Sequence, residues 1–146
     1  TAPHKFQIGA FMCPPNSGPA WHAHDYIEMF MPLGGQWRFC WSNTPDGPED
    51  GHADLNPFDM ISIPPGAWRT FSNIGDKPAF CFAVLEQHEV FAGKDPYWGS
   101  GVIGQAAAMG FAASDKGEMI KPENYAEIEQ QINAELIQWL GQAKAN

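Results

Sequence analysis

The sequence predicts an all-β domain, a barrel or sandwich of short strands, with a C-terminal helical extension. Residues 1–90 contain about seven short apolar segments with two-residue alternation, separated by turns rich in Gly and Pro. This pattern is typical of antiparallel sheets. The last third instead shows three- and four-residue apolar spacing, which is typical of helices. We place a barrel in residues 1–98 and an extension that packs on it, within the same domain, in residues 99–146.

Turn chemistry bounds each predicted strand. The predicted strands cover residues 6–13, 21–24, 27–32, 36–42, 58–64, 67–74 and 79–86. Gly34 and Gly35 predict a tight hairpin between two of them. Residues 44–57 are polar and rich in Pro and Gly, so they are predicted to form a surface excursion.

Two helices are predicted in the last third of the chain. Ser100 is placed to cap a short helix over residues 102–109, which Gly110 closes. Pro122 suits the first turn of a longer helix. That helix carries one apolar face, made by Tyr125, Ile128, Ile132, Leu136, Trp139 and Leu140. We expect this face to pack on the outside of the barrel or on a partner.

The chain is acidic, with 8 Lys and Arg against 17 Asp and Glu and a formal net charge of −9. Binding to a phosphate backbone depends on clustered Lys and Arg. No basic stripe is present, so we expect neither nucleic acid nor a membrane as a partner. No apolar run reaches the roughly 18 residues of a membrane span. A small anionic substrate is compatible with this charge, because one buried Arg can hold a carboxylate.

The three cysteines, Cys13, Cys40 and Cys81, form no C-x-x-C pair. An odd number in apolar surroundings indicates buried free thiols in a reducing compartment, and a metal-binding or redox cysteine is the alternative. We therefore expect a cytoplasmic protein. No secretory signal is visible, but the chain does not begin with Met, so whether it is full length stays open.

The sharpest local signal is the pair His22 and His24, followed by Glu28. Residues two apart on a strand point to the same face, so two imidazoles can grip one metal ion from one side. Glu28 follows a predicted bend and can add a carboxylate. Two His and one carboxylate with open positions suit non-haem iron, and also serve Mn, Ni or Zn. These three residues are the predicted metal ligands.

Two motifs around these residues resemble those of the cupin superfamily. The first runs from Gly18 through the His pair to Glu28 and, after six more residues, to Gly35. The second is the segment 64–73, in which P-x-G is followed by an Asn seven residues after the Gly. The resemblance covers residues 18–73. It implies a jelly-roll β-barrel that is polar at one end and holds a metal there. By analogy it also implies a homodimer.

Three positions depart from the family's pattern. Asn16 and Phe58 stand where glycines are usual, and Asn tolerates a positive φ. Arg69 stands where the second motif has its histidine, normally the fourth metal ligand, and Arg does not serve as one. Either Arg69 faces the open side of a metal triad and fixes a substrate carboxylate or enolate, or the barrel lacks a metal and Arg69 pairs with Glu28.

Substitute ligands for the missing histidine are weaker candidates. His88 and Glu86 follow the strand after the second motif, and Cys40 and Cys81 lie on neighbouring strands. None of the four has the expected spacing. His52, in the polar loop, is predicted to be solvated or to belong to a lid over the mouth.

These residues lead to two functional hypotheses. The first is a metal-dependent enzyme, most simply an oxygenase with Fe, acting on a small anionic or aromatic substrate. In this hypothesis Arg69 is the catalytic residue that orients the substrate or stabilises negative charge. Isomerases and lyases also occur on similar barrels. The alternative is a metal-free barrel that binds a small ligand and has a regulatory role.

Overall fold

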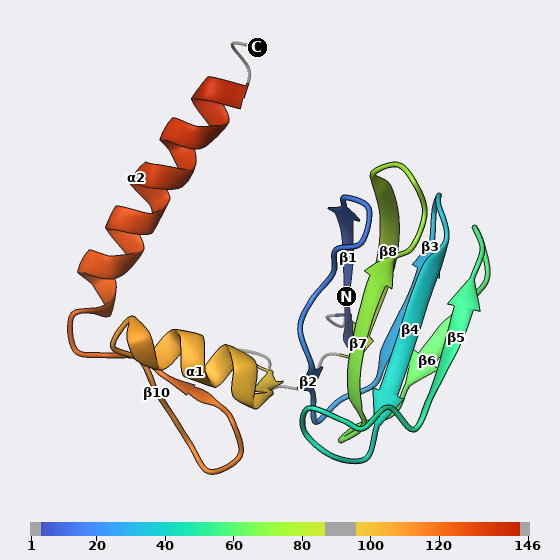
Figure 1. The fold of residues 1–146 in the computed structure, drawn as a ribbon, viewed down its shortest axis with the longest axis horizontal. Helices are drawn as coiled ribbons and strands as arrows, with labels where there is room; N and C mark the ends of the chain where they lie inside the picture. The colour runs from blue at the N-terminus through green and yellow to red at the C-terminus, as the bar shows by residue number, and fades with distance from the viewer. Residues whose placement is uncertain (1–3, 87–95, 144–146) are drawn as a thin grey trace.

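Two antiparallel sheets form the body of the structure, a computed structural model that describes residues 4–86 and 96–143 (Figure 1). In spatial order, the four-stranded sheet consists of β1 (Phe6–Cys13), β8 (Ala79–Glu86), β3 (Glu28–Pro32) and β6 (Ile61–Ile63). The five-stranded sheet consists of β5 (Gly51–Leu55), β4 (Trp37–Ser42), β7 (Trp68–Asn73), β2 (His22–Ala23) and β9 (Tyr97–Trp98). This arrangement confirms the predicted all-β, jelly-roll class.

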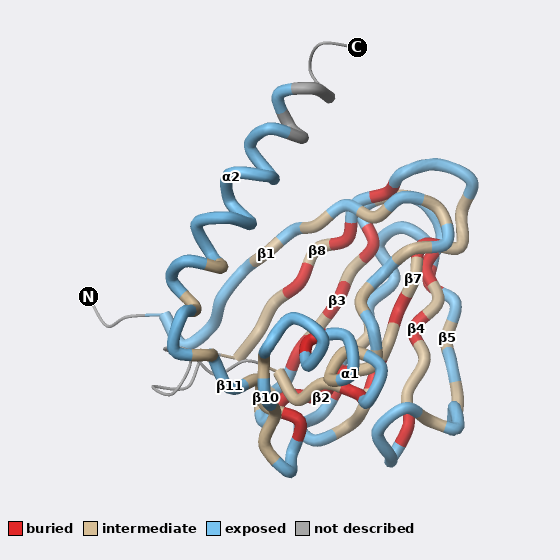
Figure 2. The backbone as a smooth tube through the Cα atoms, turned by 60° about the vertical axis from the view of Figure 1, so that its left-hand side comes forward, coloured by how far each residue is buried: buried red, intermediate tan, exposed pale blue. Residues whose placement is uncertain are grey.

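Alternation along the strands sends one set of side chains into the space between the sheets. Trp37 and Phe39 of β4 are 0% exposed. The ring of Phe71 on β7 lies 4.7 Å from that of Phe30 on β3, so the two sheets meet through aromatic packing. The buried core comprises Phe30, Trp37, Phe39, Leu55, Ile63, Phe71, Ala79, Cys81 and Ala83. Figure 2 shows buried stretches, in red, along strands of both sheets.

Several motif residues act through the backbone. Asn16, Phe58 and Gly66 adopt φ values of 57°, 73° and 78°, the region in which glycine is favoured. The two positions where this chain replaces the family's glycines therefore keep the glycine-like conformation. Asn73 is fully buried, and its Nδ2 donates hydrogen bonds to the carbonyls of Cys13 (2.9 Å) and Lys77 (2.7 Å). It ties β7 to β1 and to the turn before β8.

The polar segment 44–57 was predicted to be a surface excursion, and part of it is instead the edge strand β5. Ala53 and Leu55 alternate with polar residues there and face the core, and Leu55 is 8% exposed. Gly51 packs against the indole of Trp41, where a Cβ would lie 2.7 Å from a ring atom. The Pro/Gly composition concealed this short half-buried pattern.

The last third of the chain is helical with a small hairpin. It contains α1 (Ser100–Ala108), the paired strands β10 (Ala112–Ala113) and β11 (Met119–Ile120), and α2 (Tyr125–Ala143). Gly110 follows α1 at φ 88°, as its predicted closing role requires. Ser100, predicted as the cap, is instead the first helical residue, and the carboxylate of Asp46 accepts its backbone N–H. Within the described residues, no helix is long and apolar enough to cross a membrane.

Helix α2 projects away from the barrel (Figure 1). We expected its apolar face to pack on the outside of the barrel or on a partner. The side chains of Ile132 and Leu136 are 53% and 49% exposed, so packing on the barrel is not observed. The connection from β11 directs the helix outward, and this leaves the second of the two expectations open.

Candidate metal centre

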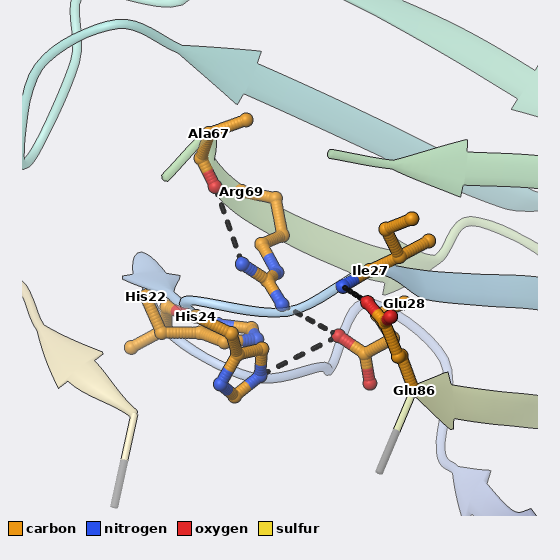
Figure 3. A network of polar contacts seen from close by, with 8 residues as sticks. His22, His24, Ile27, Glu28, Ala67, Arg69 and Glu86 are labelled. Carbon is orange, nitrogen blue, oxygen red and sulfur yellow. Dashed lines mark hydrogen bonds and ion pairs between the residues drawn. The ribbon is translucent and has the colours of Figure 1, made fainter. Parts of the chain in front are cut away.

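The predicted ligands meet at one end of the barrel (Figure 3). β2 carries His22 in the five-stranded sheet, opposite Arg69 of β7, and β3 carries Glu28 in the four-stranded sheet. His24 follows β2, and its carbonyl accepts the backbone N–H of Gly66 at 2.7 Å. The P-x-G turn of the second motif thus holds the backbone of a predicted ligand in the first.

The three side chains form a group that can hold one metal ion. One ligand atom from each of His22, His24 and Glu28 lies within 4.8 Å of the other two. All three residues are buried, at 6%, 8% and 6% exposure. Protein ligands lie about 2.0–2.2 Å from such an ion, so small side-chain rotations bring the three atoms onto one centre. Two imidazoles and a carboxylate are also a donor set that transition metals accept.

His22 is held in the neutral form that a metal requires. Its Nδ1 lies 2.7 Å from the carbonyl oxygen of Ala20, which only accepts, so Nδ1 carries the proton and Nε2 keeps its lone pair. Burial, and then the charge of Arg69, lower the pKa of His22 to about 4. A fixed tautomer with a basic Nε2 is the usual condition of a metal-bound histidine.

His24 carries an unsatisfied nitrogen. Its ring stacks on Tyr26 with centroids 4.5 Å apart, and its Nε2 lies 3.5 Å from Oε2 of Glu28. The buried Nδ1 has no hydrogen-bond partner among the described residues. Leaving a buried polar atom unpaired costs about 1–3 kcal/mol. A metal ion bound to a ring nitrogen of His24 would give this histidine a further partner. The donor set of His22, His24 and Glu28 therefore fits a metal.

Arg69 forms a buried ion pair with Glu28. The guanidinium is 0% exposed and donates from Nη2 to Oε2 of Glu28 at 2.8 Å and from Nη1 to the carbonyl of Ala67 at 3.2 Å. Burial raises the pKa of Glu28 to about 7 and lowers that of Arg69 to about 9. Both contacts of the carboxylate use Oε2, so Oε1 makes no hydrogen bond within the described residues and stays available to a metal.

Of the two arrangements left open for Arg69, the structure has the ion pair. Among the described residues that line the cavity beside the triad, Arg69 is not included. Its Nε has no hydrogen-bond partner among the described residues. The ion pair does not displace the triad, because Glu28 keeps its second oxygen. The contact of Arg69 is therefore with Oε2 of Glu28, one of the three predicted metal ligands.

A cavity of about 340 Å³ adjoins the triad. It exists because two neighbouring positions in one inward row of the four-stranded sheet are occupied by small residues. In this row Gly9 of β1 pairs with Ala83 of β8, and Ala83 pairs with Phe30 of β3. A Cβ built on Gly9 would meet nothing within 4 Å. The next row toward the mouth pairs Leu85 with Glu28.

The cavity is aromatic at its floor and polar at one wall. Phe11, Phe30 and Phe71 line the floor, and His22 and Glu28 supply the polar atoms. The aromatic rings are packed against one another, with centroids of Phe11 and Phe71 5.4 Å apart. Gly9 and Ala83 were not among the predicted site residues. The signal was a glycine at an inward position of an otherwise alternating strand, two residues before Phe11.

The other candidate ligands do not join the triad. Cys81 is buried in the core and its thiol contacts the carbonyl of Phe82, whereas Cys40 lies on β4 beside Arg38 and Glu49. Burial raises the pKa of Cys81 to about 12 and is the main cause that raises the pKa of Cys40 to about 11. Their thiols are therefore protonated at neutral pH.

Two further candidates lie elsewhere. Glu86 accepts the backbone N–H of Ile27, and His88 lies outside the described residues. His52, predicted to be solvated or part of a lid, lies on the edge strand β5 with its Nδ1 2.6 Å from Glu49. Among the described residues, His22, His24 and Glu28 are the group that could hold a metal.

Comparison with known proteins agrees with this geometry. A family model described as "Cupin domain" matches residues 9–85, more than half of the 146 residues. The chain belongs to the cupin family. The matched region includes both strands of the triad and the whole aromatic floor of the cavity. No protein of curated function matches this cupin closely enough to count as a relative.

Solved structures share the fold at low sequence identity. BH2720 from Bacillus halodurans is 14% identical, with a TM-score of 0.54 over 57% of this chain and 64% of its own. The capsular polysaccharide assembling protein CapF from Staphylococcus aureus is 16% identical, with a TM-score of 0.55 over 67% of this chain and 29% of its own. A Klebsiella pneumoniae protein with a double-stranded β-helix domain is 16% identical, with a TM-score of 0.50 over 58% of this chain and 70% of its own.

These likenesses concern the fold alone. The chain spans less than two thirds of BH2720 and under a third of CapF. The function of this cupin is therefore inferred from its triad, its ion pair and its cavity.

Proposed function

We propose that this cupin binds one divalent transition metal through His22, His24 and Glu28 and acts on a small anionic or aromatic organic substrate, in an oxygenase-type reaction. The observation that carries the proposal is three buried ligand atoms within 4.8 Å of one another at the wall of a cavity of about 340 Å³. Iron is the expected metal, and Mn, Ni or Zn are the alternatives. When bound with open coordination positions, such a metal supplies redox and Lewis-acid chemistry.

The protein's own groups prepare the site for the metal and the substrate. The carbonyl of Ala20 fixes the tautomer of His22, so that Nε2 faces the site as a neutral donor. Arg69 donates to Oε2 of Glu28 and thereby fixes the carboxylate beside the two histidines. The phenyl rings at the floor exclude water from the substrate's apolar part. In this proposal Arg69 is a positioning residue, because it acts through Glu28.

Charge and shape define the substrate class. A divalent metal together with Glu28 and Arg69 leaves an excess of positive charge, which a substrate anion would neutralise. The floor of Phe11, Phe30 and Phe71 favours a flat apolar body. A cavity of about 150 Å³ holds benzene, so this larger cavity has room for one ring and an acidic group. We therefore expect a small aromatic or unsaturated acid, or a phenol.

Metal content is the test of the proposal. Protein purified without an affinity tag or added metal should contain close to one Fe, Mn, Ni or Zn per chain by elemental analysis. His22→Ala should lose the metal while the barrel stays folded, as judged by circular dichroism. His52→Ala, which changes an exposed histidine on β5, is the matched control and should keep it. A chain without metal that takes up none on titration would overturn the proposal.

The buried ion pair favours a second candidate function. Because Arg69 already neutralises Glu28 at 2.8 Å, the barrel can be stable without a metal and bind a small ligand in a regulatory role. In that case His22→Ala would leave the affinity for a probe such as benzoate nearly unchanged. Arg69→His separates the two candidates. It restores the family's fourth ligand and should tighten metal binding if the triad is a metal site.

We extend the proposal to the location of the protein and to its partners. Cys13, Cys40 and Cys81 are all free thiols, which favours a reducing, cytoplasmic location. The net charge of −9 favours a small molecule over nucleic acid as the partner.

A further inference from the structure

Within the described part of the chain, no hydrogen bond fixes the orientation of the His24 ring. Its Nδ1 is buried without a partner, and its Nε2 lies 3.5 Å from Oε2 of Glu28 (Figure 3). That separation is longer than the usual range of about 2.7–3.2 Å for a hydrogen bond from nitrogen to oxygen. His22 differs, because its Nδ1 is held by the carbonyl of Ala20 at 2.7 Å. A group other than a hydrogen-bond acceptor must therefore orient His24.

An aromatic ring lies against His24 in place of such an acceptor. The ring of Tyr26 stacks on the imidazole, with centroids 4.5 Å apart and an angle of 19° between the planes. Aromatic pairs favour this separation, and near-parallel contact restrains tilting of the imidazole. A second ring contact comes from His22, which meets His24 near its edge, 5.2 Å away and at 73°. His22 is itself a predicted ligand, so Tyr26 is the neighbour that lies outside the ligand set.

The bend between β2 and β3 that carries Tyr26 is anchored on both sides. Before Tyr26, the carbonyl of His24 accepts the backbone N–H of Gly66 at 2.7 Å. After it, the carbonyl of Ile27 accepts the backbone N–H of Glu86, the last residue of β8, at 2.9 Å. Tyr26 is half-buried. Its backbone is therefore held by segments distant in sequence, as a residue that supports a metal ligand requires.

We propose that Tyr26 is a positioning residue of the metal centre, whose ring holds the imidazole of His24 in the orientation that binds the metal. This inference rests on the proposed metal site and assigns the group that orients its second histidine. A metal-bound histidine is usually oriented by a hydrogen-bond acceptor, and loss of that acceptor weakens metal binding about 10–100-fold. A stacked ring restrains tilt without adding to the basicity of the imidazole, so we expect an effect at the lower end of this range.

Stacking suits a metal ligand because it uses only the face of the imidazole. The two nitrogens lie at the edge of the ring, so contact with Tyr26 leaves them available to a metal. The same contact excludes water from the face that it covers. A purely structural role, in which Tyr26 stabilises the bend and does not affect the metal, is the alternative that the experiment has to separate.

Binding of Co(II) to the full chain tests the proposal, because a site of this donor type accepts Co(II) and the visible absorption bands report its coordination geometry. Tyr26→Leu removes the stack and keeps an apolar side chain. It should raise the Co(II) dissociation constant about tenfold and shift the visible bands. Tyr26→Phe keeps the stack and should match the wild type in both measurements. Tyr26→Met, whose flexible side chain adapts to the space, repeats the test with a second non-aromatic replacement.

Tyr125→Leu is the matched control. Tyr125 is also half-buried and also contacts an aromatic ring, that of Phe111, but it begins α2, which projects away from the barrel (Figure 1). The Tyr125→Leu chain should bind Co(II) as tightly as the wild type and with the same bands.

The outcomes separate this inference from the proposed function. A wild-type chain that binds no Co(II) overturns the proposed metal site and the role of Tyr26 with it. If the wild type binds Co(II) and Tyr26→Leu binds it equally tightly, the metal site stands and the role of Tyr26 is overturned. Binding by Tyr26→Phe as weak as that by Tyr26→Leu also overturns it, because the hydroxyl and not the stacked ring would then be responsible. Weaker binding with unchanged bands overturns it as well, since that result indicates a general loss of stability and not a misplaced ligand.

Discussion

The cavity beside the triad depends on a single missing side chain, that of Gly9. The neighbouring inward position on β1 is Phe11, which fills the core, while Gly9 leaves open space between the aromatic floor and Glu28. A strand interior gains stability from larger side chains, and glycine there weakens it. The cost is offset if the space receives a ligand.

We predict that Gly9→Leu narrows the cavity without disturbing the metal ligands. The isobutyl group fills the open space beside Gly9 in the wall of this cavity of about 340 Å³. The affinity of the metal-loaded protein for benzoate, measured by calorimetry, should fall at least tenfold, while metal content stays at that of the wild type. Gly104→Leu is the control, because its Cβ also meets nothing within 4 Å but lies on α1. Unchanged benzoate binding in Gly9→Leu would place the ligand elsewhere.

Phe58 is a residue held in a conformation that suits glycine. It adopts φ 73° and its side chain is 72% exposed, so little packing compensates the backbone strain. Such a conformation costs a non-glycine residue about 1–3 kcal/mol, and glycine's greater freedom in the unfolded chain returns about 0.5–1 kcal/mol of that. We predict that Phe58→Gly stabilises the protein by about 1 kcal/mol, seen as a rise of roughly 2–4 °C in Tm.

The reverse substitution controls for this effect. Gly66 adopts φ 78° in open space, so Gly66→Ala adds strain without a clash and should lower Tm by a similar amount. A fall in Tm for Phe58→Gly would show that the aromatic side chain makes a stabilising contact that outweighs the strain.

At the scale of elements, the start of α1 is held by a residue distant in sequence. The carboxylate of Asp46 accepts the backbone N–H of Ser100 through Oδ1 at 2.9 Å and Oδ2 at 3.0 Å. The hydroxyl of Ser100 makes no capping bond. We predict that Asp46→Ala lowers the free energy of unfolding by about 1 kcal/mol, the usual value of a cap, whereas Ser100→Ala changes it by a few tenths at most. Urea unfolding of both variants measures the difference, and equal effects would contradict it.

The strands were predictable because their information is local. Period-two alternation and the turn residues located β1, β3, β4, β6, β7 and β8, and motif spacing alone was enough to group His22, His24 and Glu28 as one site. The edge strand β5 was missed because the Pro and Gly residues around it concealed its short half-buried pattern. The cap from Asp46 depends on a contact between segments distant in sequence, which composition does not reveal. The direction of α2 was not predictable for the same reason. The apolar residues of α2 indicate that the helix packs on some surface, but not which surface.

The partner of Arg69 was predicted as one of two alternatives, and the sequence could not choose between them. Both have the same residue types at the same spacing. The choice depends on the reach of the guanidinium across the barrel to Glu28, which is a property of how far apart the two sheets lie at the mouth.

At the scale of the whole molecule, metal binding and folding are linked. A ligand at 100 times its dissociation constant stabilises the folded state by about 2.7 kcal/mol, which is roughly 5–10 °C in Tm for a domain of this size. We predict this increment near pH 7.5 on addition of Fe(II) without oxygen, or of Zn(II). The His22→Ala chain should show none, and this control separates the triad from adventitious metal sites.

The same increment should shrink as the pH falls from 7 to 5. Burial raises the pKa of Glu28 to about 7, so below that pH a proton competes with the metal for the carboxylate. One competing proton weakens binding about tenfold, or about 1.4 kcal/mol, per pH unit. The pKa of His22, lowered to about 4, means that this ligand adds no competing proton in the same range. A loss close to a hundredfold per unit would contradict the assignment of one titrating ligand.

The metal-free chain should behave differently, because there the two groups act in opposite directions. The raised pKa of Glu28 stabilises the folded state fully below its usual value of 4.5, and this contribution is lost as the pH rises toward 7. The lowered pKa of His22 contributes stability fully above 6.5, and this is lost as the pH falls toward 4. Between pH 5 and 6.5 the contributions offset each other, so the Tm of the metal-free protein should vary little while the increment from metal falls steeply. Thermal unfolding at matched pH, with and without metal, measures both. An increment that stays constant down to pH 5 would remove Glu28 from the ligand set.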